Sequence, residues 1–147
     1  MIMTTALLFV GIFLKPDYSK QRKKHYILFS FVLLFVISAF RDYSVGVDTK
    51  TYINLYSIAD KVNIINSRWE PGYIVLLKIL RHISNSPAIL LFVSSGICVG
   101  STCLFVKKFS KDVTLAIVLY ILLRNYFYQM NIMRQMLAVA LCLLAFT

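Results

Sequence analysis

Charged residues are scarce in this chain of 147 residues: they make up 15% of it, whereas hydrophobic residues make up 59%. A soluble domain averages about 25% charged and about 45–50% apolar residues. The apolar residues also come in continuous runs and not in periodic stripes. This pattern excludes an ordinary soluble domain and indicates an integral membrane protein.

Acidic residues are especially few, with six Asp and Glu against sixteen Lys and Arg, which gives a net charge of +10. A protein that binds nucleic acid carries its basic residues on a soluble face with aromatic residues between them. Here most basic residues lie in short gaps between apolar runs, where they orient a membrane protein. We therefore expect no nucleic acid among the partners.

Motifs of metal and nucleotide chemistry are missing as well. The sequence has no Walker loop, no GxSxG, no HExxH and no DxD-type acidic pair for a nucleotide sugar. Cys98, Cys103 and Cys142 lie inside apolar runs without CxxC or Cys/His spacing, so neither a zinc site nor a disulfide framework is indicated. No metal and no cofactor are expected.

The apolar runs predict an all-α fold, a polytopic bundle of membrane-spanning helices that forms a single domain over residues 1–147. A helix needs about 20 mostly apolar residues to cross the roughly 30 Å hydrocarbon core. Residues 87–106 meet this requirement without a charge. Further spans are predicted at residues 1–14, 25–40, 112–130 and 132–147; the first two are short, and the third contains Arg124.

Two connectors, at residues 15–24 and 107–112, concentrate Lys and Arg. Basic residues in short loops face the cytoplasm. The connectors are two spans apart, as alternation of the chain across a membrane requires. The N-terminus and the long segment 41–86 are then expected outside the cytoplasm.

The last residues, "MLAVALCLLAFT", have no cap, no basic flank and no polar tail. We expect the chain to be the N-terminal part of a longer protein or a truncated copy of one. The alternative is a small complete membrane protein that ends in a span.

The outer segment 41–86 is predicted to contain short amphipathic helices. "DTKTYINLYSIADKV" has a helix start signal at Asp48 and apolar residues at helical spacing. "EPGYIVLLKILRHI" places Pro71 in a first helical turn. It is too short to span, so we expect an interfacial or re-entrant helix, with Trp69 and Tyr73 at the membrane–water boundary.

Charged side chains from several spans are expected to meet on this outer face. Arg41 ends the second span, Asp48 and Glu70 lie in the outer segment, and Arg134 opens the last span. Asn131, Arg134 and Gln135 share one helix face because they are three and four residues apart.

Several of the charged residues also have a structural interpretation. Arg41 could snorkel to lipid headgroups, and Asp48 could cap a helix. Glu70 could simply start a helix. Arg124 could face a cavity or a partner, or it could mark an early helix end.

Three stretches, "FRDYSVGVDTKTYINLY", "WEPGYIVLLKIL" and "NIMRQMLAVAL", together resemble the EpsG family of bacterial polysaccharide polymerases, which are related to the Wzy O-antigen polymerases. The residues that carry the resemblance occur in the family's order: Arg41, Gly46, Asp48, Tyr52, Glu70, Gly72, Tyr73, Arg134 and Gln135. The chain departs at Val47, where the family often has Thr. It matches only the N-terminal portion of the family, whose members carry further spans.

The resemblance implies glycosyl transfer at the outer face of a bacterial inner membrane. A hydroxyl of one lipid-linked repeat unit would attack the sugar carbon that joins the growing glycan to a polyprenyl pyrophosphate. Arg41 and Arg134, with Arg124 third, would stabilise the departing diphosphate, and either Asp48 or Glu70 would accept the proton. Tyr52, Trp69, Asn131 and Gln135 would contact the substrate.

The partners implied are a polyprenyl-pyrophosphate-linked oligosaccharide, membrane lipid and other membrane proteins of polysaccharide assembly. Two alternatives stay open. One is a non-catalytic assembly subunit or a truncated remnant of the polymerase. The other is a transporter of lipid-linked glycans, which would place polar residues along the midplane of several helices.

Overall fold

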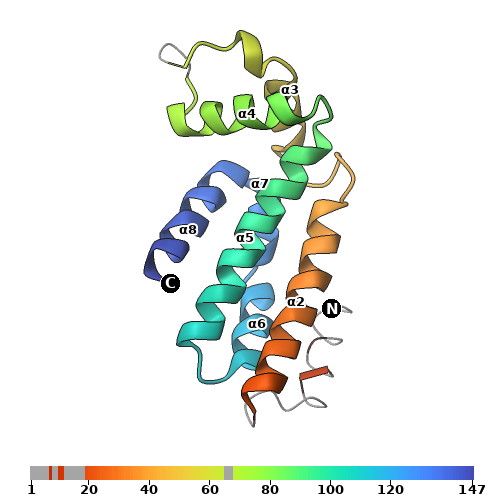
Figure 1. Cartoon of the computed structure of the whole chain (residues 1–147). Coiled ribbons are helices and arrows are strands. Elements are labelled where there is room, and N and C mark those ends of the chain that lie inside the picture. Colours follow the sequence, from red (N-terminus) through yellow and green to blue (C-terminus); the bar gives the residue numbers. More distant parts are fainter. Residues whose placement is uncertain (1–6, 8–9, 12–18, 65–67) are drawn as a thin grey trace.

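The computed structural model describes residues 7, 10–11, 19–64 and 68–147. These residues form helices and connecting loops and contain no strand (Figure 1), which confirms the all-α class. The elements are α2 (Lys20–Ala39), α3 (Thr49–Ser57), the short 3₁₀ helix η2 (Ala59–Lys61), α4 (Pro71–Ile83), α5 (Ala88–Phe109), α6 (Val113–Leu122), α7 (Asn125–Asn131) and α8 (Met133–Phe146).

Helix α5 is the centre of the bundle and packs between α2 and α8 (Figure 1). It begins one residue after the start of the predicted span 87–106 and extends three residues beyond its end. Small residues allow α2 to come close: the Ser38 and Ser95 hydroxyls lie 2.8 Å apart. A Cβ atom added at Gly96 would lie 3.5 Å from the Phe35 ring.

Helix α2 begins five residues before the predicted span 25–40, inside the basic connector. The uncharged stretch 26–39 is about 21 Å long at 1.5 Å per residue, which is shorter than a bilayer's hydrocarbon core. Its outward face is nevertheless apolar and 43% to 55% exposed, through Leu28, Phe29, Val32, Val36 and Ile37. Such a face suits contact with lipid.

The predicted span 112–130 is broken in the structure. Helix α6 ends at Leu122 and α7 begins at Asn125, with a bend of 47° between them. Arg124 lies at the break with a left-handed φ of 63°, a conformation that cannot continue a right-handed helix. Arg124 therefore marks an early helix end, the second of the two roles considered for it.

Of the other two predicted spans, one forms a helix shorter than the hydrocarbon core of a bilayer, and the other lies largely outside the described residues. Helix α8 has 14 residues and measures about 21 Å. Of residues 1–14, only Leu7, Val10 and Gly11 are among the residues described. Within the described ranges, α5 alone is long and apolar enough to cross a membrane, and α6 with α7 meets the same criterion only as a bent pair.

The described residues of segment 41–86 form a layer of short helices, α3, η2 and α4, across one end of the bundle (Figure 1). Pro71 is the first residue of α4, as predicted. One face of α4 buries Tyr73, Ile74, Leu77 and Leu80, whereas Ile79 is 55% exposed. The segment is therefore a folded cover and not a linker.

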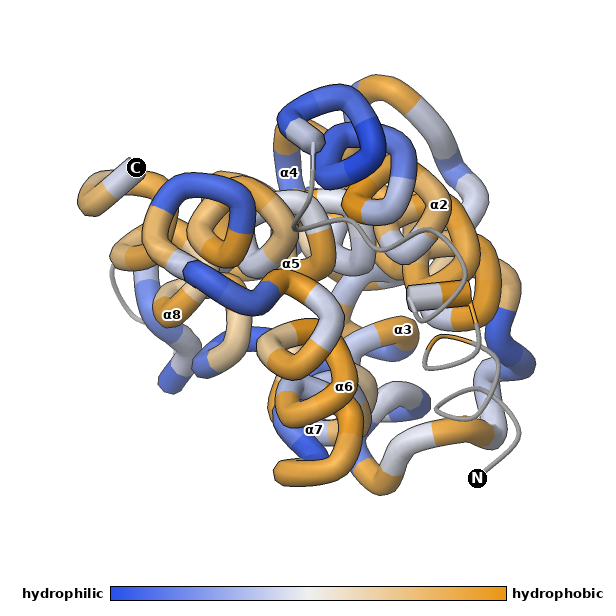
Figure 2. The backbone as a smooth tube through the Cα atoms, turned by 90° about the horizontal axis from the view of Figure 1, so that it is seen from below, coloured by the Kyte–Doolittle hydropathy of each residue, from blue (hydrophilic) through white to orange (hydrophobic). Residues whose placement is uncertain are grey.

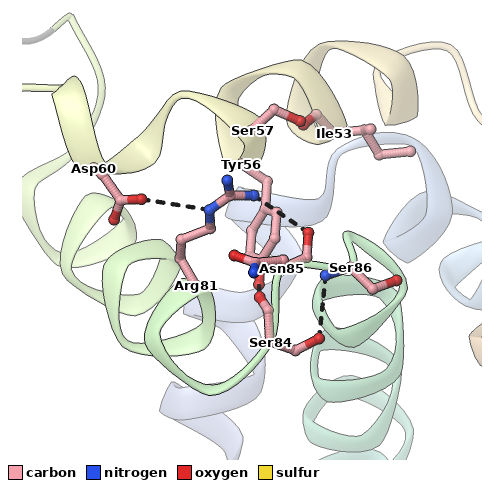
Figure 3. Close-up of polar contacts among 8 residues, drawn as sticks. All are labelled: Ile53, Tyr56, Ser57, Asp60, Arg81, Ser84, Asn85 and Ser86. Carbon is pink, nitrogen blue, oxygen red and sulfur yellow. Dashed lines mark hydrogen bonds and ion pairs between the residues drawn. The ribbon is translucent and has the colours of Figure 1, made fainter.

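Arg81 connects the two halves of this cover (Figure 3). Its Nε donates to Asp60 at 3.4 Å, and its Nη1 donates to the carbonyl of Asn85 at 3.2 Å. Its guanidinium also lies 5.7 Å from the centre of the Tyr56 ring, whose hydroxyl donates to the Ser84 carbonyl at 2.6 Å. These contacts hold α3 and η2 against the C-terminal end of α4.

Two apolar clusters fill the interior. One lies beneath the cover and joins α3 and α4 to α5 and α8. The other lies among α2, α5, α6 and α7. In the end-on view of Figure 2, the backbone of α5, α6 and α8 is coloured largely as hydrophobic residues. The first cluster supports the candidate site.

Candidate functional site

The loop that follows α2 is fixed to the junction of α7 and α8. Gly46 adopts a φ of +97°, and a Cβ atom there would come within 2.4 Å of the Met130 carbonyl oxygen. The Val47 N–H donates to Asn131 Oδ1 at 3.0 Å. The Thr49 hydroxyl donates to the Met130 carbonyl at 3.3 Å. Asn131 therefore positions this loop in the structure.

Glu70 and Arg134 form an ion pair between α4 and α8. Glu70 is the residue before α4, where its extended backbone starts the helix, and Arg134 lies in the first turn of α8. The Arg134 Nη1 donates to Glu70 Oε2. Hydrogen bonds from the Glu70 backbone and from Arg134 lower the pKa of Glu70. This carboxylate, 64% exposed, is thus ionised and accessible at neutral pH.

Aromatic side chains surround this ion pair. The Arg134 guanidinium lies 4.5 Å from the centre of the Trp69 ring, and it also contacts the Tyr52 side chain. Tyr52 packs edge-on against Trp69 at 6.4 Å and against Tyr73 at 5.9 Å between ring centres. A cation held over an aromatic face is stabilised electrostatically, so the cluster fixes the guanidinium.

A pocket of about 320 Å³ opens beside the ion pair. Its lining is Glu70, Gly72, Tyr73, Leu76, Arg134, Gln135, Leu137, Ala138 and Leu141. The charged pair and Gln135 form its polar edge, and leucines of α4 and α8 form an apolar wall. Arg134 Nε and the Tyr73 hydroxyl are buried here without a hydrogen-bond partner. The pocket can therefore accept a ligand that has both a polar and an apolar part.

Tyr73 lines the pocket, but the sequence analysis placed it only at the membrane boundary and among the residues of the family resemblance, and not among the site residues. It lies on the same face of α4 as Leu77 and Leu80, so its spacing indicates packing alone. Burial raises the pKa of Tyr73, and its hydroxyl remains a proton donor. Its position three residues after Glu70, within the stretch "WEPGYIVLLKIL" that carries the family resemblance, is the signal that could have connected it with the site.

Arg41 lies apart from this pocket. Its Nη1 donates to the Ser38 carbonyl at 3.0 Å, and its guanidinium is close to Tyr126 and Cys98. Its Nε and Nη2 are buried and unpartnered. The side chain therefore points into the bundle, against α5 and α7, and does not snorkel outward.

Asp48 and Arg124 also lie outside the pocket. Asp48 occupies the position before α3, but its side chain makes no capping hydrogen bond. Arg124 is exposed at the α6–α7 break.

Of the predicted site residues, the structure brings together Tyr52, Trp69, Glu70, Arg134 and Gln135. Among the residues that the structure describes, no three acidic, His or Cys side chains cluster as metal ligands do.

Comparison with known proteins gives one family. No curated protein and no solved structure matches the chain. The model of the EpsG family matches residues 24–147, which include every element from α3 to α8 and nearly all of α2. The chain therefore belongs to the EpsG family, whose members act in polysaccharide biosynthesis and are associated with membranes.

Proposed function

We propose that this protein takes part in polymerising lipid-linked oligosaccharide repeat units into a cell-surface polysaccharide, at the outer face of a bacterial cell membrane. The observation that carries the proposal is the Glu70–Arg134 pair at the mouth of a pocket with aromatic residues beside it and an apolar wall. Membership of the EpsG family supports the same reaction class.

The proposed reaction is a glycosyl transfer. The acceptor hydroxyl of one repeat unit attacks the sugar carbon bonded to a polyprenyl diphosphate, and the bond from that carbon to the diphosphate oxygen breaks. The leaving diphosphate becomes more negative in the transition state. Arg134 would stabilise it, because a fixed guanidinium fork matches phosphate oxygens. Its buried Nε, which lacks a protein partner, is available for this contact.

Glu70 is the better-supported candidate for the general base. It is ionised and exposed beside Arg134, so it could accept the proton of the attacking hydroxyl. Asp48 remains a candidate, but it contacts neither Glu70 nor Arg134. Trp69 and Tyr52 offer faces for sugar rings, Gln135 offers an amide at the pocket edge, and the leucine wall suits the first isoprene units.

Arg41 and Arg124 are proposed as secondary anion contacts. Arg41 has two buried donors without partners, and Arg124 is exposed at the helix break. Asn131 would act indirectly, through the loop that it holds. Other membrane proteins of polysaccharide assembly are proposed as partners.

We propose that the chain crosses the membrane several times and that the cover of α3 and α4 lies outside the cytoplasm. The basic start of α2 and the basic end of α5 lie together at the opposite end of the bundle (Figure 1). Lys23 Nζ donates to the Ser110 carbonyl at 3.1 Å across the two connectors. Positive charge gathered at one end supports a cytoplasmic location for that end.

The test replaces Glu70 with Gln and Arg134 with Lys in the protein as its cell expresses it, and follows polymer length on gels. Both variants are expected to shorten the polymer at normal protein levels, because each keeps the side chain's size and removes the carboxylate or the forked donor set. Asp60→Asn and Arg81→Lys are matched controls, since they alter the exposed ion pair in the same cover outside the pocket.

Long polymer in both Glu70→Gln and Arg134→Lys would contradict the proposed mechanism. That outcome would favour the non-catalytic assembly subunit, in which the cover binds a partner. Equal losses in the Asp60 and Arg81 controls would show a general defect of the cover and would also count against the assigned site.

A further inference from the structure

A second hollow lies at the opposite end of the bundle from the candidate site. It is a groove of about 350 Å³ between the first turns of α2 and the last turns of α5. Leu28 and Phe31 line it from α2, and Leu104 and Gly100 line it from α5. A Cβ atom at Gly100 would lie 3.6 Å from the Phe31 ring, so these two residues face each other closely where they line the groove.

Two lysines line the same groove at its outer end. Lys24 precedes Leu28 by one helical turn, and Lys107 follows Leu104 by three residues, so on both helices the charge lies nearer the end of the bundle. Within the described part of the chain, neither ammonium contacts a carboxylate. Lys23 differs, because it donates to the Ser110 carbonyl.

The groove therefore combines a charged mouth with an apolar channel. Leu28 and Leu104 are 55% and 47% exposed, which leaves a strip of hydrocarbon open beside the two ammonium groups. A free phosphate would use only the lysines, and a neutral acyl chain would use only the channel. Anionic headgroups attract basic residues at the membrane surface.

We propose that this groove binds an anionic phospholipid, with its phosphate between Lys24 and Lys107 and one acyl chain along Leu28, Phe31 and Leu104. The lipid would come from the leaflet that faces the basic connectors. This inference does not depend on the proposed function, because the groove and the pocket at Glu70 share no residue.

The experiment measures lipid retention by native mass spectrometry on the full chain in mild detergent. Phosphatidylglycerol and phosphatidylcholine with identical acyl chains are added in turn. The unaltered protein is expected to retain phosphatidylglycerol preferentially. The variant Lys24→Gln/Lys107→Gln is expected to lose that preference by roughly tenfold, since each lysine contributes a favourable contact with the anionic headgroup.

The matched control is Lys20→Gln/Lys111→Gln, which removes the same charge from the same two connectors but not from the groove. It is expected to keep the preference for phosphatidylglycerol. An equal loss in the control would show that diffuse charge is responsible, which would overturn the proposal.

A second arm alters the channel and leaves both lysines in place. Gly100→Leu fills the inner end of the groove and is expected to reduce phosphatidylglycerol retention. If circular dichroism shows that this variant does not fold, Leu28→Gln/Leu104→Gln replaces it, because both side chains are half exposed. Undiminished retention in a folded channel variant would overturn the proposal. So would displacement of the lipid by inorganic phosphate alone, or stronger retention of a polyprenyl phosphate.

Discussion

Glu70 and Arg134 are 64 residues apart in the chain and meet between α4 and α8. An ion pair as exposed as this one contributes little to folding stability. Its importance is therefore expected to be chemical: it sets a carboxylate and a guanidinium side by side at the mouth of a pocket. Substitutions of either residue should leave the fold intact, which makes their effects on polymer length interpretable.

The first residue-scale prediction concerns Tyr73. Its hydroxyl is buried without a partner, so Tyr73→Phe should leave thermal stability unchanged or slightly higher, because removing an unsatisfied polar group costs nothing. If the hydroxyl donates to a bound substrate, the same variant should shorten the polymer. The two readouts are melting temperature in detergent and polymer length in cells. A clear loss of stability would show that the hydroxyl has a structural partner.

The second residue-scale prediction concerns the pH dependence of folding stability. The pKa of Glu70 is lowered in the folded protein, so the folded state binds fewer protons than the unfolded state in the range where Glu titrates. The stabilising contribution is therefore complete above the ordinary Glu pKa of about 4.3 and is lost as pH falls through the folded pKa. A melting-temperature difference between the unaltered chain and Glu70→Gln should be small at pH 7 and vanish in acid. A difference that grows in acid would contradict the assignment.

At the scale of elements, the cover is joined to the bundle through loops as much as through helices. The loop after α2 reaches α7 through Gly46, Val47 and Thr49. The Arg81 contacts join η2 to the end of α4 (Figure 3). The contacts of Gly46, Val47 and Thr49 fix the start of α3, which carries Tyr52, against the junction of α7 and α8.

Gly46→Ala is expected to destabilise the protein. The residue has a positive φ, and its new methyl group would meet the Met130 carbonyl at 2.4 Å. The left-handed conformation alone costs about 1–2 kcal/mol for a residue with a Cβ atom. Gly72→Ala is the matched control, because a Cβ atom there meets nothing within 4 Å and alanine favours a helix. Equal melting temperatures for the two variants would contradict this account of the loop.

At the scale of the whole molecule, the two ends of the bundle differ in the charged groups that they carry. The basic ends of α2 and α5 lie at one end, and the cover with its candidate site lies at the other (Figure 1). The long apolar α5 connects them. This arrangement separates a positively charged end from an end that carries the carboxylate site.

Accessibility of single cysteines tests the proposed orientation. Cys142 is exposed whereas Cys98 and Cys103 are buried, so the background for labelling is the Cys142→Ser variant. In this background, Lys50→Cys should react with a membrane-impermeant reagent in intact cells. Lys20→Cys should react only after the cells are opened. The reverse pattern would place the cover in the cytoplasm and remove the basis for polymerisation at the outer face.

Much of the fold could be predicted because local chemistry determines it. The uncharged run at 87–106 forms α5, Pro71 starts α4, and the segment 41–86 folds into short amphipathic helices. The sequence leaves two interpretations of Arg124, since a polar residue in an apolar run fits either a continuous span or a break. Its backbone conformation, which no periodicity reveals, produces the break.

The candidate site, like the fold, could be predicted from the sequence only in part. By itself, the sequence determined which residues bear charge in segment 41–86 and at the head of α8, because residue type and periodicity are local properties. Only the tertiary structure decided that Glu70 pairs with Arg134, that Tyr73 joins them and that Arg41 turns into the bundle. Those pairings depend on how α4 and α8 pack across the shared apolar cluster, and packing between distant segments leaves no periodic trace in the chain.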